Sequence, residues 1–321
     1  MNPLILVLIG IALVFSGCGG SSGDGSMTTV GEFDFAGDPT EINPVALART
    51  AKEQSETATS FRGDMEMRMT GLPEVGEFTM QMSLEAAANG DVAAVSEWVE
   101  DTRDGLGFGG SNDVRSEIRF VDGFVYVSFP QEMMEEIADT PWASFDIDEL
   151  TDVDLDNLGN FDTNTLLNYL VGIDDEAIVT LGEDVNGIPT TRISGTYTMA
   201  ELLDPLPEDQ RQAMMDSQQF FSGMANNDMN DLFKAFEKIP IQLDVWIDQN
   251  NYILRELIVI DQWYEFIVAI DPSAEDSKEE IDDLVQIIDM YFYDYGAPIT
   301  ITAPPEQDVT HIQGSFAESL L

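Results

Sequence analysis

Hydrophobic and polar residues alternate along two neighbouring stretches of the chain, residues 65–70 and 78–85. Alternation with a period of two is typical of a β-strand that buries one face. The intervening residues 72–76 contain proline and glycine, so a hairpin should join the two strands and place their apolar rows side by side. The apolar positions of this pair are Met65, Met67, Met69, Phe78, Met80, Met82 and Leu84.

Further strands are predicted along most of the chain. Residues 114–121 and 124–129 flank an Asp-Gly pair, and an Asn-Gly pair lies at 186–187. Both pairs favour a tight hairpin turn. The remaining predicted strands cover residues 91–100, 177–183, 188–198, 239–247, 254–260, 263–270 and 287–295.

Helices are predicted between the strands. Asn43-Pro44 has the residue types of an N-cap and a first helical position, and helix-forming residues continue to Thr57. Two short helices are expected at 133–138 and 163–171, and a longer, broken one at 207–236. The sequence therefore predicts an α+β fold, in which helices cover the concave apolar face of a single curved antiparallel sheet, or half-barrel.

The N-terminus has the pattern of a lipoprotein signal. An apolar run from Leu4 to Phe15 ends two small residues before Cys18, the only cysteine. The alternative is an uncleaved transmembrane helix, but this run is well short of the roughly 20 apolar residues that such a helix needs. We expect a signal peptide at 1–17, an acylated Cys18 with a flexible Gly/Ser/Asp tether at 18–40, one domain at 41–310 and a tail at 311–321. Acyl chains such as palmitate on Cys18 would hold the domain at the extracytoplasmic face of the cell membrane.

The net charge limits the range of partners. The chain has 61 acidic and 13 basic residues, giving a formal charge of -48. Nucleic acid is excluded as a partner because its phosphates need a basic surface. An anionic lipid surface would also repel the domain, so membrane residence would depend on Cys18. The acidity suits either a calcium-rich surface or a salty exterior, where added ions screen mutual repulsion, and we favour the second.

Residues for catalysis or metal binding are sparse. His311 is the only histidine, so a serine triad would depend on it and a histidine metal pair is impossible. The acidic loop 152–159 matches a calcium loop only in part. The glycine-rich residues 105–110 precede a strand and not the helix that a phosphate site needs. We expect no enzyme, cofactor or metal site, and a calcium-dependent glycan-acting protein stays as an alternative.

Three segments resemble one lipoprotein family. The segments are VNGIPTTRISGTY at 185–197, IPIQLDVWID at 239–248 and DYGAPITITAPP at 294–305. They are similar to the LppX/LprG lipoproteins of mycobacterial type, which look like half-barrels related in shape to the LolA and LolB carriers. The resemblance implies a hydrophobic cavity between sheet and helices, and carriage of a lipid or an acylated glycolipid within the cell envelope. A transporter or acceptor protein in the envelope would then be a partner.

The methionine rows are the first candidates for a cavity wall, because methionine is flexible and polarisable. A face predicted from alternation can equally be a packed core. The second function is therefore a non-enzymatic surface interaction or structural lipoprotein with a filled core. The candidate ligand-binding residues are Met65, Met67, Met69, Phe78, Met80, Met82, Leu84, Ile118, Phe120, Phe124, Tyr126, Leu243 and Val245.

Overall fold

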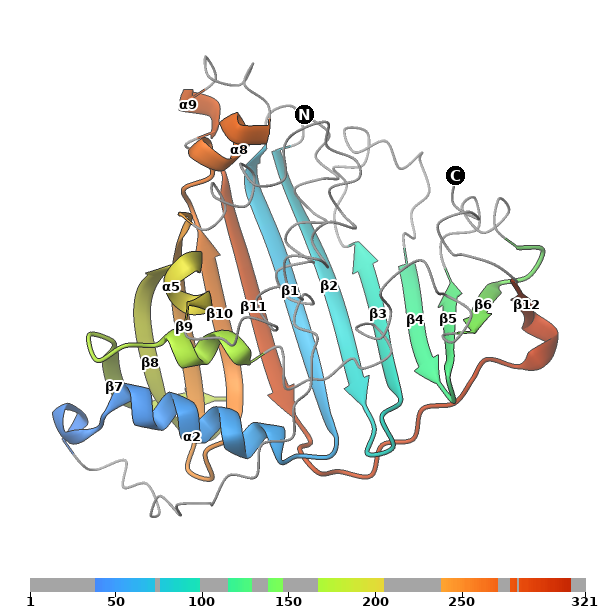
Figure 1. Cartoon of the computed structure of the whole chain (residues 1–321), viewed down its shortest axis with the longest axis horizontal. Helices are drawn as coiled ribbons and strands as arrows, with labels where there is room; N and C mark the ends of the chain where they lie inside the picture. The colour runs from blue at the N-terminus through green and yellow to red at the C-terminus, as the bar shows by residue number, and fades with distance from the viewer. Residues whose placement is uncertain are drawn as a thin grey trace.

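The computed structural model describes residues 38–72, 76–98, 115–128, 138–146, 167–204, 238–270, 278–281 and 283–312. Their strands form one 12-stranded sheet in the order β12-β6-β5-β4-β3-β2-β1-β11-β10-β9-β8-β7. Figure 1 shows the sheet fanning from β7 to β12. The prediction of an α+β fold with a single, mostly antiparallel sheet is confirmed.

The strands cover most of the described chain. Their bounds are β1 Phe61–Leu72, β2 Gly76–Ala86, β3 Val92–Trp98, β4 Arg115–Val121, β5 Phe124–Ser128, β6 Trp142–Asp146, β7 Ile178–Val185, β8 Ile188–Thr198, β9 Pro240–Asp248, β10 Ile253–Ile260, β11 Val285–Tyr293 and β12 Val309–His311. The helices are α2 Pro44–Glu56, α5 Met199–Leu203, α8 Tyr264–Ile270 and α9 Lys278–Ile281, and the 3-10 turns are η1 Pro39–Glu41, η4 Asn168–Gly172 and η6 Glu306–Asp308.

Two meanders meet at one strand. β1 to β6 pair in chain order, as do β7 to β10, and β11 lies between β1 and β10. These pairs are antiparallel, and the added β12 is parallel to β6. The sheet therefore becomes continuous only when the late strand β11 pairs with the early strand β1.

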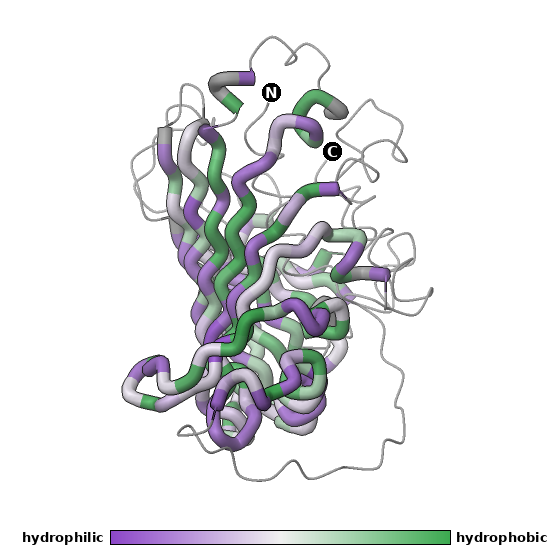
Figure 2. Tube along the Cα trace, turned by 90° about the vertical axis from the view of Figure 1, so that its left-hand side faces the viewer, coloured by the Kyte–Doolittle hydropathy of each residue, from purple (hydrophilic) through white to green (hydrophobic). Residues whose placement is uncertain are grey.

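The hairpin of β1 and β2 confirms the predicted side-by-side methionine rows. Met65 lies opposite Met82, Met67 opposite Met80, and Met69 opposite Phe78. We call the face that carries these side chains the inner face and the opposite one the outer face. Figure 2 shows the alternation of hydrophobic and hydrophilic positions along the strands.

Helix α2 covers part of the inner face. It begins as predicted, because the Asn43 side chain accepts a hydrogen bond from the Ala46 backbone N–H at 2.8 Å. Its residues Leu47, Ala48 and Ala51 are buried in the same apolar cluster as the methionine rows. Figure 1 shows α2 and α5 on one side of the sheet, over the strands β8 to β10.

Some predicted elements differ from the structure. Residues 264–270 form helix α8 and not a strand. Trp263, Phe266 and Ile267 are buried at helical spacing, and an apolar run this short does not distinguish the two periods. β6 and β12 were not predicted, and the end of the short helix expected at 163–171 is the 3-10 turn η4. The helix expected at 207–236 lies outside the described residues, as does the one expected at 133–138 except for its last residue.

Candidate functional site

Strand register places most of the predicted wall residues on one surface. A single row crosses five strands from β9 to β2 through Leu243, Ile258, Ile288, Met67 and Met80. A second row joins Leu84 to Ile118 through Ala94. The wall candidates that share the inner face are Met65, Met67, Met69, Phe78, Met80, Met82, Leu84, Ile118, Phe120, Leu243 and Val245.

The methionine part of this surface is covered. Met67 and Met69 are 0% exposed, Phe78 is 1% exposed and Met80 is 2% exposed. They belong to one large apolar cluster with residues of β8 to β11 and α2. A ligand that contacts these side chains must therefore replace protein atoms that now pack on them.

Phe124 and Tyr126 lie on the outer face, so the structure does not bring them together with the methionine rows. In β5 the inward side chains are Val125 and Val127, which lie opposite Phe120 and Ile118 of β4. The ring of Tyr126 points to the outer face, where it packs in an apolar cluster that includes Ile301 and Val309 of the C-terminal segment. The prediction failed here because β5 is apolar at alternate positions on both of its faces.

Several predicted features lie outside the described residues. They include the acyl anchor Cys18, the acidic loop 152–159 and the glycine-rich segment 105–110. Within the described ranges, no group of three or more His, Cys, Asp or Glu side chains could hold a metal ion. In the same part of the chain, no helix has the length and hydropathy needed to cross a bilayer.

Among the described residues, four buried polar side chains interrupt the apolar inner face. They are Thr191, Tyr197, Glu256 and Gln286, with exposed fractions of 5% or less. The amide Nε2 of Gln286 donates to the Met67 sulfur at 3.2 Å. Burial raises the pKa of Tyr197 to about 12, because the phenolate would lose its hydration.

Sequence reasoning missed these groups because a polar residue in a strand usually faces water. The sequence of β11 contained a sign of this, because Gln286 occupies the same alternating positions as the apolar residues Ile288, Met290 and Phe292. In β10, Glu256 is likewise in step with Ile258 and Ile260. A polar residue at an apolar position of an alternating strand was the available clue.

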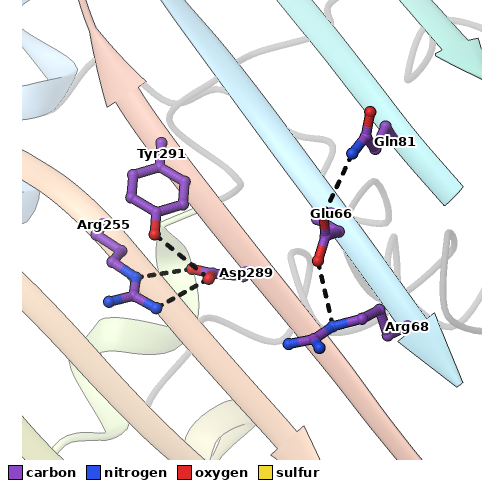
Figure 3. A network of polar contacts seen from close by, with 6 residues as sticks. All are labelled: Glu66, Arg68, Gln81, Arg255, Asp289 and Tyr291. Carbon is purple, nitrogen blue, oxygen red and sulfur yellow. Dashed lines mark hydrogen bonds and ion pairs between the residues drawn. The ribbon is translucent and has the colours of Figure 1, made fainter. Parts of the chain in front are cut away.

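The outer face has an ion-pair network across the strands (Figure 3). Arg255 makes two hydrogen bonds of 2.8 Å to Asp289, and its guanidinium lies 4.5 Å from the Trp246 ring centroid and 5.1 Å from that of Tyr291. Asp289 raises the pKa of Arg255 by stabilising the charged form. The arginines whose side chains lie on this face are Arg62, Arg68, Arg115, Arg119, Arg192 and Arg255. Each of these arginines forms an ion pair with a neighbouring carboxylate, so their positive charges are balanced on this face.

His311 joins the C-terminal strand to the sheet. Its Nδ1 lies 2.6 Å from the Ser144 hydroxyl oxygen, and its Nε2 lies 3.0 Å from a Glu306 carboxylate oxygen. Serine, histidine and glutamate could together form a catalytic triad. Ser144, however, is only 1% exposed, and its strand β6 is paired on both sides, with β5 and β12. The arrangement holds β12 on β6 and does not present a nucleophile to a substrate.

Comparisons with known proteins give likenesses of fold alone. No family model matches the chain, and no curated protein matches it. The crystal structure of LprF from Mycobacterium bovis aligns at 13% identity and a TM-score of 0.40, over 81% of this chain and 96% of that one. Mycobacterium tuberculosis lipoprotein LppX aligns at 13% identity and a TM-score of 0.33, over 80% and 97%. A LolA superfamily protein from Nitrosomonas europaea aligns at 7% and 0.22, over 83% and 96%. Sequence identities and TM-scores this low do not assign the chain to a family.

Proposed function

We propose that this protein binds the acyl chains of a lipid or an acylated glycolipid against the inner face of its sheet and carries them within the cell envelope, without covalent chemistry. The observation that carries the proposal is the methionine content of this face. Six methionines lie together on β1, β2 and β11, namely Met65, Met67, Met69, Met80, Met82 and Met290.

A core that needs only to be filled has little reason to concentrate methionine. β-strands favour branched and aromatic residues, and a core of fixed shape favours side chains with few rotamers. Methionine has an unbranched chain and a polarisable sulfur, so a methionine surface can repack around ligands of different length. These properties suit acyl chains, which are uniform in chemistry and variable in length.

Burial of the ligand supplies the binding free energy. Each methylene group that leaves water stabilises a complex by about 0.8 kcal/mol. The inner-face positions Gln286 and Phe292 lie six residue steps apart in β11, or about 20 Å along the strand. Since Met67 and Met69 are fully covered in this structure, part of the gain is offset by the protein contacts that the ligand replaces.

We also propose that Cys18 is the acyl anchor and that the domain lies on the extracytoplasmic face of the cell membrane. The support is the apolar run and the small residues before this cysteine. Intact mass of the membrane form should show loss of residues 1–17 and gain of acyl groups. An unmodified chain that still begins at Met1 would contradict the anchor.

Photocrosslinking tests the lipid site. The full chain is incubated with a palmitate analogue carrying a diazirine at the end of its chain, irradiated and digested. We expect labelled peptides from β1, β2 and β11, and competition by unlabelled palmitate. Label confined to residues 1–17, or no label that palmitate displaces, would reject the proposal.

The alternative is an interaction or structural lipoprotein with a filled core, and the complete burial of Met67 and Met69 favours it. The variant Met65→Leu/Met67→Leu/Met82→Leu separates the two functions. Leucine keeps the volume, so stability should change little. A lipid-binding face should lose tolerance for acyl chains of different length, whereas a filled core would show no change in lipid behaviour.

A further inference from the structure

The most unusual polar group on the inner face is the side-chain amide of Gln286. The residue is 0% exposed and lies in register between Ile260 of β10 and Met69 of β1. Both neighbours are fully buried apolar side chains. An amide has a carbonyl that accepts up to two hydrogen bonds and an NH₂ that donates two.

Very little of this capacity is used. The Nε2 donates to the sulfur of Met67, which is a weak acceptor. Among the described residues, no donor contacts the buried Oε1 of Gln286. An unsatisfied buried carbonyl destabilises the fold, and a leucine or methionine at this position would avoid that cost.

The position of Gln286 in the fold suggests what the carbonyl is for. Gln286 is the second residue of β11 and lies opposite Met69, at one end of the methionine rows. Figure 1 shows that β11 begins on the side of the sheet where α8 and α9 lie. The buried side chains of Trp263, which precedes α8, and Ile281, the last residue of α9, belong to the same apolar cluster as the methionine rows. A chain lying along the rows from this end toward Phe292 would pass within reach of this amide.

We propose that Gln286 is a specificity residue, whose carbonyl accepts a hydrogen bond from a hydroxyl or amide N–H on the bound lipid. The inference rests on the proposed lipid binding and adds the chemical class of the ligand. The donor belongs either to the acyl chain itself, as in a hydroxylated fatty acid, or to the first polar group beyond it, as in a monoacylglycerol.

Two matched pairs of lipids test this with the full chain. Displacement of a fluorescent fatty acid is measured for stearate against a stearate hydroxylated within its chain, and for methyl palmitate against monopalmitoylglycerol. The lipid whose donor contacts Gln286 should bind about fivefold more tightly than its partner, as one added hydrogen bond allows. The pair that shows the preference identifies whether the donor lies on the chain or at the head.

The decisive variant is Gln286→Met, which keeps the length of the side chain and removes the carbonyl. We expect it to lose the preference, so that the two lipids of the pair bind with equal affinity, and to unfold at a higher urea concentration without lipid. Gln286→Leu repeats the test if methionine is not tolerated. Gln81→Met is the control, since Gln81 lies on the outer face and its amide donates to Glu66 at 3.2 Å.

The outcomes are distinct. Equal affinity within both lipid pairs, or a preference that survives in the Gln286 variants, overturns this inference and leaves lipid binding standing. Absence of displacement by all four lipids instead rejects the proposed function, and the inference with it.

Discussion

The end of β1 approaches the segment before β11 so closely that only glycine fits there. Gly71 has a φ of +78°, and a Cβ added to it would lie 2.1 Å from the Asp283 carbonyl oxygen and 2.9 Å from the Leu284 backbone nitrogen. Both atoms are backbone, so they cannot rotate away. We therefore expect Gly71→Ala to destabilise the fold through two separate effects.

The first effect is conformational, because an alanine in the left-handed region costs about 1–2 kcal/mol. The second is steric, because forcing an extra group into a packed site costs typically about 1–3 kcal/mol. Together they predict a loss of about 2–5 kcal/mol. Gly123 isolates the first effect, since its φ is +82° and an added Cβ would meet nothing within 4 Å.

Urea unfolding of the two variants provides the assay. The midpoint should fall for both, more for Gly71→Ala, with an unchanged slope because the surface exposed on unfolding is the same. The difference between the variants should be about 1–3 kcal/mol. If Gly71→Ala and Gly123→Ala agree within about 0.5 kcal/mol, the close contact at Asp283 has no energetic effect and the reasoning fails.

Three further perturbations have defined outcomes. Asn43→Ala removes the N-cap of α2 and should cost about 1 kcal/mol in urea unfolding, and an unchanged midpoint would show that the cap is idle. The pKa of Tyr197 is raised to about 12 by burial, so its stabilising effect is complete below about pH 10 and is lost as the pH rises through 12. Tyr197→Phe should therefore weaken the decline of stability between these pH values, and an identical decline would contradict the assignment. A double-mutant cycle of Arg255→Lys and Asp289→Asn should give a coupling of about 1–2 kcal/mol, because the pair is bidentate and its side chains are 26% and 17% exposed; additivity would refute it.

Local patterns predicted the local structure well. The alternation in β1 and β2, with a proline and glycine loop between them, correctly predicted a hairpin whose methionine rows lie side by side on one face. Asn43 and Pro44 gave the correct start of α2. These features depend on residues close in the sequence, whose periodicity and turn chemistry act directly on the backbone.

Features that depend on contacts between distant segments could not be predicted from the sequence. The pairing of β11 with β1 brings together segments more than 200 residues apart, and no short pattern encodes it. β12 has only three residues, and its place beside β6 depends on contacts such as that of His311 with Ser144. The side of the sheet to which Phe124 and Tyr126 point depends on what covers each face, because both faces of β5 are apolar.

The alternation predicted most of the apolar side chains that share the inner face and missed the polar ones. A row of methionines in an alternating pattern predicts a buried face, whereas in the sequence a buried glutamine cannot be distinguished from a polar residue that faces water. Gln286 is recognisable only after the register shows that it shares a face with Met69. The polar groups with the most information about a ligand are thus the ones that alternation is least able to place.

Native mass spectrometry of the full chain, purified from a lipid-containing host and compared before and after solvent extraction, tests the central claim most directly. Lipid binding at the inner face predicts a stoichiometric non-covalent lipid that extraction removes and that incubation with membrane lipids restores. A mass without lipid before extraction and after incubation would contradict the account and favour an interaction protein with a filled core.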